Sequence, residues 1–172
     1  VVVIGGGNTA MDTARAAKRT NGVEKVSLVY RRTKRYMPAD AEELEMAVED
    51  GVEFCELLAP GRLEAVKLVC KLGDLDASGR RGVVETGEFA EVDADTVIVA
   101  VGEKVPTAFY KANGLHVSER GKALVNEETL ESNVAGVYVV GDGLGGPATV
   151  VEGIRDGKMA AEAVIGECLA KD

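Results

Sequence analysis

The chain has 172 residues, and its 20 basic and 29 acidic side chains give a formal net charge of −9. With 46% apolar and 28% charged residues, it can bury a core and is not composed like a disordered protein. The acidic balance disfavours nucleic acid or an anionic membrane as a partner, because both would be repelled. No apolar run approaches the ~18 residues of a membrane-spanning helix.

The three cysteines, Cys55, Cys70 and Cys168, are an odd number and lie far apart, without a C-x-x-C pair. This pattern predicts neither a disulfide framework nor a zinc site. We expect buried structural thiols in a reducing, cytoplasmic compartment. The single histidine, His116, has no neighbouring base or ligand. The sequence therefore predicts no catalytic side chain and no metal ligand.

The first thirty residues predict a strand, a tight turn, a helix and a second strand. Residues 1–4 are a β-branched run, typical of a strand covered on both faces. Apolar positions then recur at helical spacing, at Ala10, Met11, Ala14 and Ala17. Residues 21–22 end this helix, and residues 26–30 form a second buried strand. The pattern is a βαβ unit with a right-handed crossover.

The next seventy residues predict an α/β fold with an added antiparallel meander. Asp40 and Glu43 suggest a capping box for a second helix with an apolar face, which Gly51 ends. A strand over 52–58 follows. Alternation over 62–92, with turn residues at 76–79, predicts the meander, and residues 95–101 predict another buried strand.

A domain boundary is expected between residues 102 and 106. Short strands are expected at 115–117, 123–125 and 137–140, followed by a long helix from Pro147 to about Ala170.

A glycine-rich motif, Gly5-Gly6-Gly7-Asn8-Thr9-Ala10, joins the first strand to the first helix and matches G-x-G-x-x-A. The first glycine permits the tight turn, the third lets a pyrophosphate approach the backbone, and the alanine keeps helix and strand close. The helix N-terminus favours phosphate through its free N–H groups and dipole. The motif predicts dinucleotide binding, with a glycine turn that binds no ligand as the alternative.

A basic segment, Tyr30-Arg31-Arg32-Thr33-Lys34-Arg35, follows the second strand. NAD-binding units usually carry Asp or Glu there, which would repel a 2′-phosphate. Arg31 and Arg32 can instead bind that phosphate through charge-assisted hydrogen bonds. The segment favours NADPH over NADH. For Lys34 and Arg35, phosphate binding and simple solvation fit the pattern equally.

A second candidate segment, Gly141-Asp142-Gly143, ends the strand expected at 137–140 and precedes the last helix. A carboxylate at a strand end can accept hydrogen bonds from sugar or ribitol hydroxyls. The N-terminus of the following helix can stabilise negative charge on a ring system. Ordinary turn chemistry is the alternative explanation.

Four stretches together resemble the FAD-dependent pyridine nucleotide-disulphide oxidoreductase superfamily, and within it the small-subunit group of NADPH-dependent glutamate synthase. They are GGGNTAMD, VYRRT with the following YMPA and EE, DTVIVAVGE, and GVYVVGDGLGGPATVVEGIRDGKMAAEA. The segment GPATVVEGI is closer to the selenate-reductase-like iron–sulfur subunits of that group. The absence of paired cysteines separates the chain from the thioredoxin-reductase branch.

The resemblance implies that hydride passes from NADPH to FAD, and that electrons continue to an iron–sulfur domain or a partner oxidoreductase subunit. NADPH would be held by the glycine-rich motif and the two arginines, and FAD by the second segment and the start of the last helix. Gly102 would lie at the crossover between domains. The implied cofactor-binding residues are Gly5, Gly6, Gly7, Asn8, Thr9, Ala10, Arg31, Arg32, Gly102, Gly141, Asp142, Thr149 and Val150.

Members of this family also bind FAD through an N-terminal glycine-rich βαβ unit, whereas this sequence has one such motif, already assigned to NADPH. We therefore expect a fragment. Residues 1–103 would form an NADP(H)-binding Rossmann domain, and residues 104–172 the C-terminal return segment of a FAD-binding domain. A non-catalytic NADP-binding sensor or regulatory module is the alternative, although such a module has no evident need for the segment at 141–143.

Overall fold

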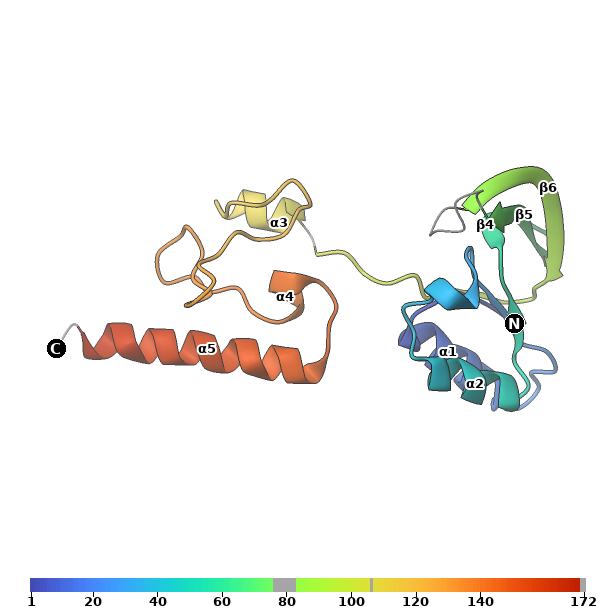
Figure 1. Ribbon diagram of the computed structural model, residues 1–172, viewed down its shortest axis with the longest axis horizontal. Coiled ribbons are helices and arrows are strands. Elements are labelled where there is room, and N and C mark those ends of the chain that lie inside the picture. The colour runs from blue at the N-terminus through green and yellow to red at the C-terminus, as the bar shows by residue number, and fades with distance from the viewer. Residues whose placement is uncertain (76–82, 106, 171–172) are drawn as a thin grey trace. The chain divides into compact units, whose positions relative to one another are not determined.

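The computed structural model describes residues 1–75, 83–105 and 107–170. The chain divides into two compact units, Val1–Gly102 and Glu103–Asp172, whose elements are labelled in Figure 1.

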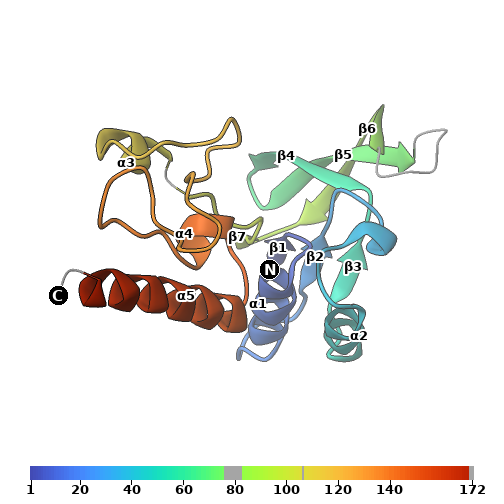
Figure 2. The ribbon, with the colours of Figure 1, turned by 60° about the vertical axis from the view of Figure 1, so that its left-hand side comes forward.

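A four-stranded parallel sheet forms the centre of the first unit. Its strands are β1 (Val2–Ile4), β2 (Ser27–Val29), β3 (Glu53–Cys55) and β7 (Val97–Val99), in the order β3-β2-β1-β7. Each lies within a segment for which the sequence predicts a strand, and β1, β2 and β3 are visible together in Figure 2. The α/β prediction is confirmed.

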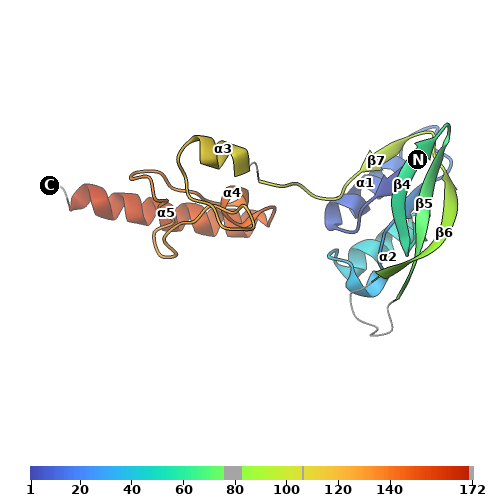
Figure 3. The ribbon, with the colours of Figure 1, turned by 90° about the horizontal axis from the view of Figure 1, so that it is seen from above.

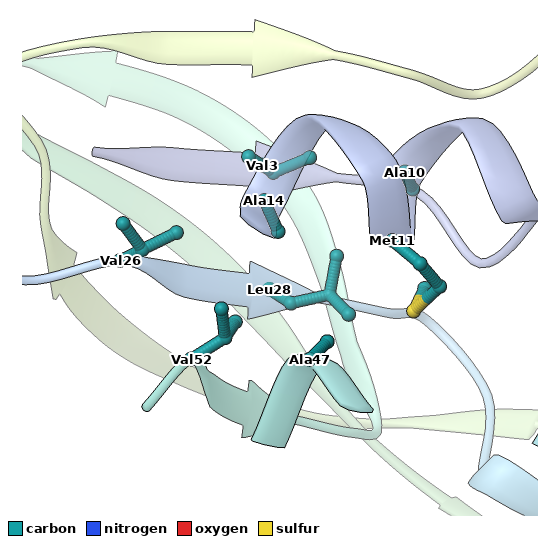
Figure 4. Close-up of a cluster of buried hydrophobic side chains, with 8 residues drawn as sticks. All are labelled: Val3, Ala10, Met11, Ala14, Val26, Leu28, Ala47 and Val52. Carbon is teal, nitrogen blue, oxygen red and sulfur yellow. The ribbon is translucent and has the colours of Figure 1, made fainter. Parts of the chain in front are cut away.

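Two helices cover one face of this sheet. They are α1 (Asn8–Lys18) and α2 (Ala41–Glu49). Figure 4 shows the side chains that fill the space between helices and strands; all are at most 4% exposed: Val3, Ala10, Met11, Ala14, Val26, Leu28, Ala47 and Val52. The predicted stripe of α1 supplies three of them, so helical periodicity identified the buried face of this helix.

An antiparallel meander covers the other face of the sheet. It comprises β4 (Leu58–Glu64), β5 (Lys67–Leu75) and β6 (Val83–Asp93), in the order β4-β5-β6, and is seen from above in Figure 3. Leu58, Leu68 and Cys70 pack on Val2 and Val29 of the parallel sheet. The predicted meander is confirmed, while the turn expected at 76–79 lies outside the described residues.

The single strand expected over 52–58 is wrong, because the segment contributes to both sheets. Leu57 has a positive φ of 61°, which an extended strand does not allow. Its N–H donates to Arg32 O at 3.2 Å, and its carbonyl accepts from Gly73 N at 2.8 Å. The chain therefore leaves the parallel sheet after Cys55 and joins the antiparallel one at Leu58.

The capping box expected at Asp40 and Glu43 is also wrong. Asp40 is the N-cap of α2, but its side chain makes no capping hydrogen bond. Its carboxylate accepts a hydrogen bond from Asn8 instead. The carboxylate that would cap α2 is instead bound by Asn8, which is 32 residues away in sequence.

The described residues of the second unit form three helices, α3 (Thr107–Ala112), α4 (Asp142–Gly145) and α5 (Val150–Leu169). Of the strands expected at 115–117, 123–125 and 137–140, the described residues form isolated bridges alone, at Val117–Ala123, Val125–Ser132 and Glu131–Tyr138. A small core holds these loops together, with Tyr110, Leu115, Ala123 and Val139 buried. The two short helices α3 and α4 were not predicted.

The long C-terminal helix is confirmed as α5, starting at Val150 rather than at Pro147. Of the cysteines expected to be buried, Cys70 is buried, Cys55 is half-buried and Cys168 is exposed on α5. The expectation for Cys168 is therefore wrong. None of the helices formed by the described residues combines the length and the apolarity that a membrane crossing requires.

Candidate functional site

The loop after β1 is shaped by two glycines that have no room for a side chain. A Cβ atom on Gly5 would lie 2.3 Å from Ala100 O, and one on Gly6 would lie 2.3 Å from the ring of Tyr30. Gly7 differs, because a Cβ atom there would have no atom within 4 Å. The first two glycines let the loop pack on the sheet, whereas the third faces open space.

The N-terminus of α1 opens beside Gly7. Gly7 O accepts from Ala10 N at 2.9 Å and from Met11 N at 3.3 Å. Within the described part of the chain, the N–H groups of Gly7, Asn8 and Thr9 donate to no acceptor, as is usual in a first helical turn. No acidic residue occupies that turn. These free donors and the positive end of the helix dipole fit a phosphate group.

The side chain of Asn8 points to another loop. Asn8 Nδ2 donates to Asp40 Oδ2 at 3.0 Å, and Asp40 N donates to Asn8 Oδ1 at 3.0 Å. Thr9 is exposed, and Ala10 is fully buried in the core. Of the predicted motif, therefore, Gly7, Asn8 and Thr9 present backbone donors, while Ala10 serves the packing.

The predicted basic segment leads into a short 3₁₀ helix, η1 (Lys34–Tyr36). Tyr30 OH donates to Tyr36 O at 2.9 Å, and Lys34 N donates to Glu56 Oε2 at 2.8 Å. Arg31, Lys34 and Arg35 are exposed, and Arg32 is half-buried. These two contacts hold the backbone at residues 34 and 36, and they leave the side chains of Arg31, Lys34 and Arg35 exposed.

The cationic side chains of this segment have no carboxylate partner among the described residues. Among the described residues, none of the four cationic side chains of the segment pairs with a carboxylate. Six other cations of the same unit each lie within 4 Å of a carboxylate oxygen: Arg15, Arg19, Lys25, Arg62, Lys67 and Lys71. The segment thus keeps a local positive charge in an acidic chain.

The glycine-rich loop and the basic segment meet at one edge of the sheet. β1 and β2 are parallel neighbours, with Ile4 opposite Val29. Gly5 N donates to Val29 O at 3.1 Å, and the ring of Tyr30 lies under Gly6. In open α/β sheets, ligands bind at the carboxyl ends of the strands, where these two loops lie.

The second predicted segment forms a tight turn at the start of α4. Gly141 has φ 57° and ψ −140°, and its N–H donates at 3.2 Å to Oδ2 of Asp156, a buried residue of α5. Tyr110 OH donates to Gly143 O at 2.7 Å. Asp142 is exposed, and its Oδ1 accepts from Ala148 N at 3.2 Å. Sequence reasoning missed Asp156 and Tyr110, since neither contact leaves a local pattern.

The helix after this turn begins with a complete capping box. Thr149 N donates to Glu152 Oε2 at 2.9 Å, and Glu152 N donates to Thr149 Oγ1 at 3.3 Å. Hydrogen bonds from the backbone and the hydroxyl of Thr149 hold the pKa of Glu152 below its ordinary value. Thr149 therefore caps α5, while Val150 is 79% exposed. The T-x-x-E pattern could have revealed this box.

Gly102 ends the first unit, with φ 88°, and a Cβ atom on it would have no atom within 4 Å. The predicted site residues 5–10 and 31–32 therefore lie in the first unit, in the loops that follow the carboxyl ends of β1 and β2. The positions from Gly141 to Val150 form a separate cluster in the second unit.

A family model for pyridine nucleotide-disulphide oxidoreductases matches residues 1–157. The chain belongs to the pyridine nucleotide-disulphide oxidoreductase family. Putative oxidoreductase YgfK of Escherichia coli (strain K12) is 41% identical over 96% of this chain and 16% of its own length. The NADPH glutamate synthase small chain of Azospirillum brasilense is 40% identical over 99% of this chain and 37% of its own length.

A third relative is the NADP(+)-dependent formate dehydrogenase subunit beta of Moorella thermoacetica, 39% identical over 95% of this chain and 24% of its own length. The chain thus spans between 16% and 37% of these curated relatives. The thioredoxin reductase of T. acidophilum has the same fold, with a TM-score of 0.79 and 24% identity over 98% of this chain and 52% of that structure. The predicted resemblance is confirmed.

Proposed function

We propose that this chain is part of a flavoprotein oxidoreductase that takes hydride from NADPH to FAD. In this proposal, residues 1–103 form the NADP(H)-binding domain, and residues 104–172 are the C-terminal return segment of a FAD-binding domain. The observation that carries it is the set of four cations, without a carboxylate partner in the described chain, on the loop beside the glycine-rich loop at the open N-terminus of α1. NADPH presents a pyrophosphate and a 2′-phosphate, so it requires two anion sites of this kind.

The nucleotide would be held by backbone and side chain together. The free N–H groups of Gly7, Asn8 and Thr9 would bind the pyrophosphate, with Gly5, Gly6 and Ala10 shaping the loop. Arg31 and Arg32 would bind the 2′-phosphate. When both cofactors are bound, NADPH supplies the hydride and FAD accepts it, while the residues of this chain bind and orient them.

The second unit would contribute part of the flavin site. Asp142 has one carboxylate oxygen on Ala148 N and would use the other for ribitol hydroxyls or the nearby phosphate region. Gly141 gives this turn its shape. The N-terminus of α5, at Thr149 and Val150, would face the pyrimidine edge of the flavin. Gly102 would lie at the crossover between the domains.

Electrons would leave for iron–sulfur centres on another domain or on a partner oxidoreductase subunit. This part of the proposal is supported by two relatives whose names designate them as a small chain and a subunit beta.

A side-by-side titration with NADPH and NADH tests the nucleotide assignment. We expect a clear preference for NADPH. Replacing Arg31 and Arg32 together by alanine should weaken NADPH by about 1–2 kcal/mol, on the order of tenfold, because charge-assisted hydrogen bonds are lost. Binding of NADH should barely change. Equal losses for both nucleotides would contradict the arginine assignment, and binding of neither by the unaltered chain would contradict the nucleotide site.

A further inference from the structure

The glycine-rich loop is tied to the chain that follows the basic segment. The Asn8 amide uses its nitrogen on Asp40 Oδ2 and its oxygen on Asp40 N, both at 3.0 Å. Beside this pair, Ala39 N donates to Gly6 O at 3.0 Å. Three hydrogen bonds thus join two loops that are 32 residues apart at the Asn8–Asp40 pair.

The other end of the basic segment is held to the same loop. The ring of Tyr30 lies against Gly6, and the Tyr30 hydroxyl donates to Tyr36 O at 2.9 Å. Residues 31–36 are therefore anchored before and after their cationic side chains. The side chains themselves make no ion pairs within the described chain. Their position relative to α1 is set by these anchors.

Asp40 holds this link at a cost to its own helix. It occupies the N-cap position of α2, where a free Asp side chain would accept from the first helical N–H groups, yet its carboxylate makes no such bond. A negative charge also stands close to an anion-binding helix end, where it opposes a phosphate. The Asn8–Asp40 contact thus weakens the cap of α2 and opposes phosphate binding. What it provides is a fixed position of the two loops relative to each other.

We propose that Asn8 and Asp40 are a positioning pair that fixes the basic segment relative to the N-terminus of α1, so that one NADPH reaches both anion sites at once. This inference rests on the proposed function. A preorganised site avoids the entropy cost of ordering a loop when the ligand binds. Once the pyrophosphate is bound, a correctly placed basic segment also meets the 2′-phosphate at a high effective concentration, which increases the affinity for NADPH. NADH lacks the 2′-phosphate and needs the α1 end alone.

The test compares Kd for NADPH and NADH by titration of four variants. Asn8→Ala removes both hydrogen bonds of the pair but leaves the backbone N–H of residue 8 available to a phosphate. Asp40→Ala removes one of them. Asp40→Asn keeps an acceptor for Asn8 and serves as the conservative rescue. Asn21→Ala is the matched control, an exposed asparagine beyond the opposite end of α1.

The expected result is a loss of selectivity rather than of binding in general. Asn8→Ala should raise the Kd for NADPH about tenfold and the Kd for NADH by less than about threefold. Asp40→Ala should lie between Asn8→Ala and the unaltered chain. Asp40→Asn should keep the preference for NADPH and bind both nucleotides at least as tightly, because a negative charge has gone. Asn21→Ala should match the unaltered chain.

Each other outcome overturns a defined statement. Equal losses for NADPH and NADH in Asn8→Ala would assign Asn8 to the pyrophosphate or to the stability of α1, and would overturn the positioning role. Unchanged selectivity in Asn8→Ala would overturn it as well. Failure of the unaltered chain to bind NADPH would instead overturn the proposed function. Should Asn8→Ala not fold, the comparison of Asp40→Ala with Asp40→Asn decides in the same way.

Discussion

At the scale of single residues, the three consecutive glycines after β1 serve different purposes. Gly5 and Gly6 are excluded from carrying a side chain by Ala100 O and by the ring of Tyr30. Gly7 is not excluded by any neighbour, and its φ of −97° is open to every residue. The fold therefore requires the first two glycines but not the third, and in the proposed function the third leaves room for the pyrophosphate.

Alanine at each of the three positions separates these purposes. Gly5→Ala and Gly6→Ala should destabilise the first unit by about 1–3 kcal/mol, the scale of overpacking a close-packed site. Gly7→Ala should leave stability within about 0.5 kcal/mol and weaken NADPH and NADH alike, because its methyl group occupies the phosphate approach. Thermal unfolding without nucleotide, followed by titration, measures both effects. Tight nucleotide binding by Gly7→Ala would argue against the pyrophosphate position.

At the scale of elements, the start of α5 depends on a charged capping box. The pKa of Glu152 is lowered from 4.5, mainly by a hydrogen bond from the backbone of Thr149 and next by one from its hydroxyl. The negative charge also complements the positive end of the helix dipole. A carboxyl with a depressed pKa in the folded state stabilises the fold above its ordinary pKa, and this contribution is lost as pH falls through the folded value.

Glu152→Gln should therefore show a pH-dependent loss of stability. At about pH 7 the variant should unfold at a lower temperature than the unaltered chain, and the difference should vanish once the pH has fallen through the lowered folded-state pKa of Glu152, because the carboxyl is then protonated. Glu162→Gln, an exposed change in the middle of the same helix, is the matched control. A difference that persists at low pH would show that the charge of Glu152 has no part in the cap.

Elements that are marked by local sequence signals were predicted correctly, whereas features that depend on contacts distant in sequence were not. The strands β1, β2 and β7 and the helices α1 and α5 follow from periodicity and glycine stops, which are local signals. The split at Leu57 needs a positive φ in a residue that rarely adopts one. Asp40 was misassigned because its partner, Asn8, comes from another loop. The segment 115–140 forms isolated β-bridges between single residues. Alternation over three or four residues does not distinguish such bridges from short strands, so the strands predicted there were wrong.

The residues of the candidate site also divide into those with a local sequence signal and those without one. Gly7, Arg31 and Arg32 could be singled out from the sequence, since a known motif and a charge run mark them. Asp156 and Tyr110, which hold the turn at Gly141 and Gly143, could not, because a lone acid in a helix or a lone tyrosine carries no positional signal. Sequence reasoning thus identified the groups proposed to contact ligand and missed those that orient them.

At the scale of the whole molecule, the long helix α5 carries exposed apolar side chains. Val150, Ile154, Val164 and Ile165 are between 40% and 79% exposed in the described chain. The buried residues of this helix are Asp156 and Ala160.

The proposed role of Asp142 in binding FAD is tested in a longer chain, because the proposed flavin site also needs a preceding glycine-rich βαβ unit. In a longer chain that carries such a unit, Asp142→Ala should lower bound FAD below one per chain, as measured from the flavin absorbance of the purified protein. The physical reason is the loss of a hydrogen-bond acceptor for the ribitol region. Glu162→Ala on α5 serves as the control. Full retention of FAD by Asp142→Ala would remove this carboxylate from the proposed flavin site.

The four cations after β2 act within a molecule whose formal charge is −9. At about 0.01 M ionic strength, charges interact over ~30 Å, so the whole acidic surface repels an approaching nucleotide. Near 0.1 M the range falls to about 10 Å, and the cations of the proposed nucleotide site would dominate. Added salt first removes the distant repulsion and then weakens the local attraction. We therefore expect the affinity of the proposed nucleotide site to pass through a maximum at intermediate ionic strength, which titrations of NADPH at several salt concentrations would measure.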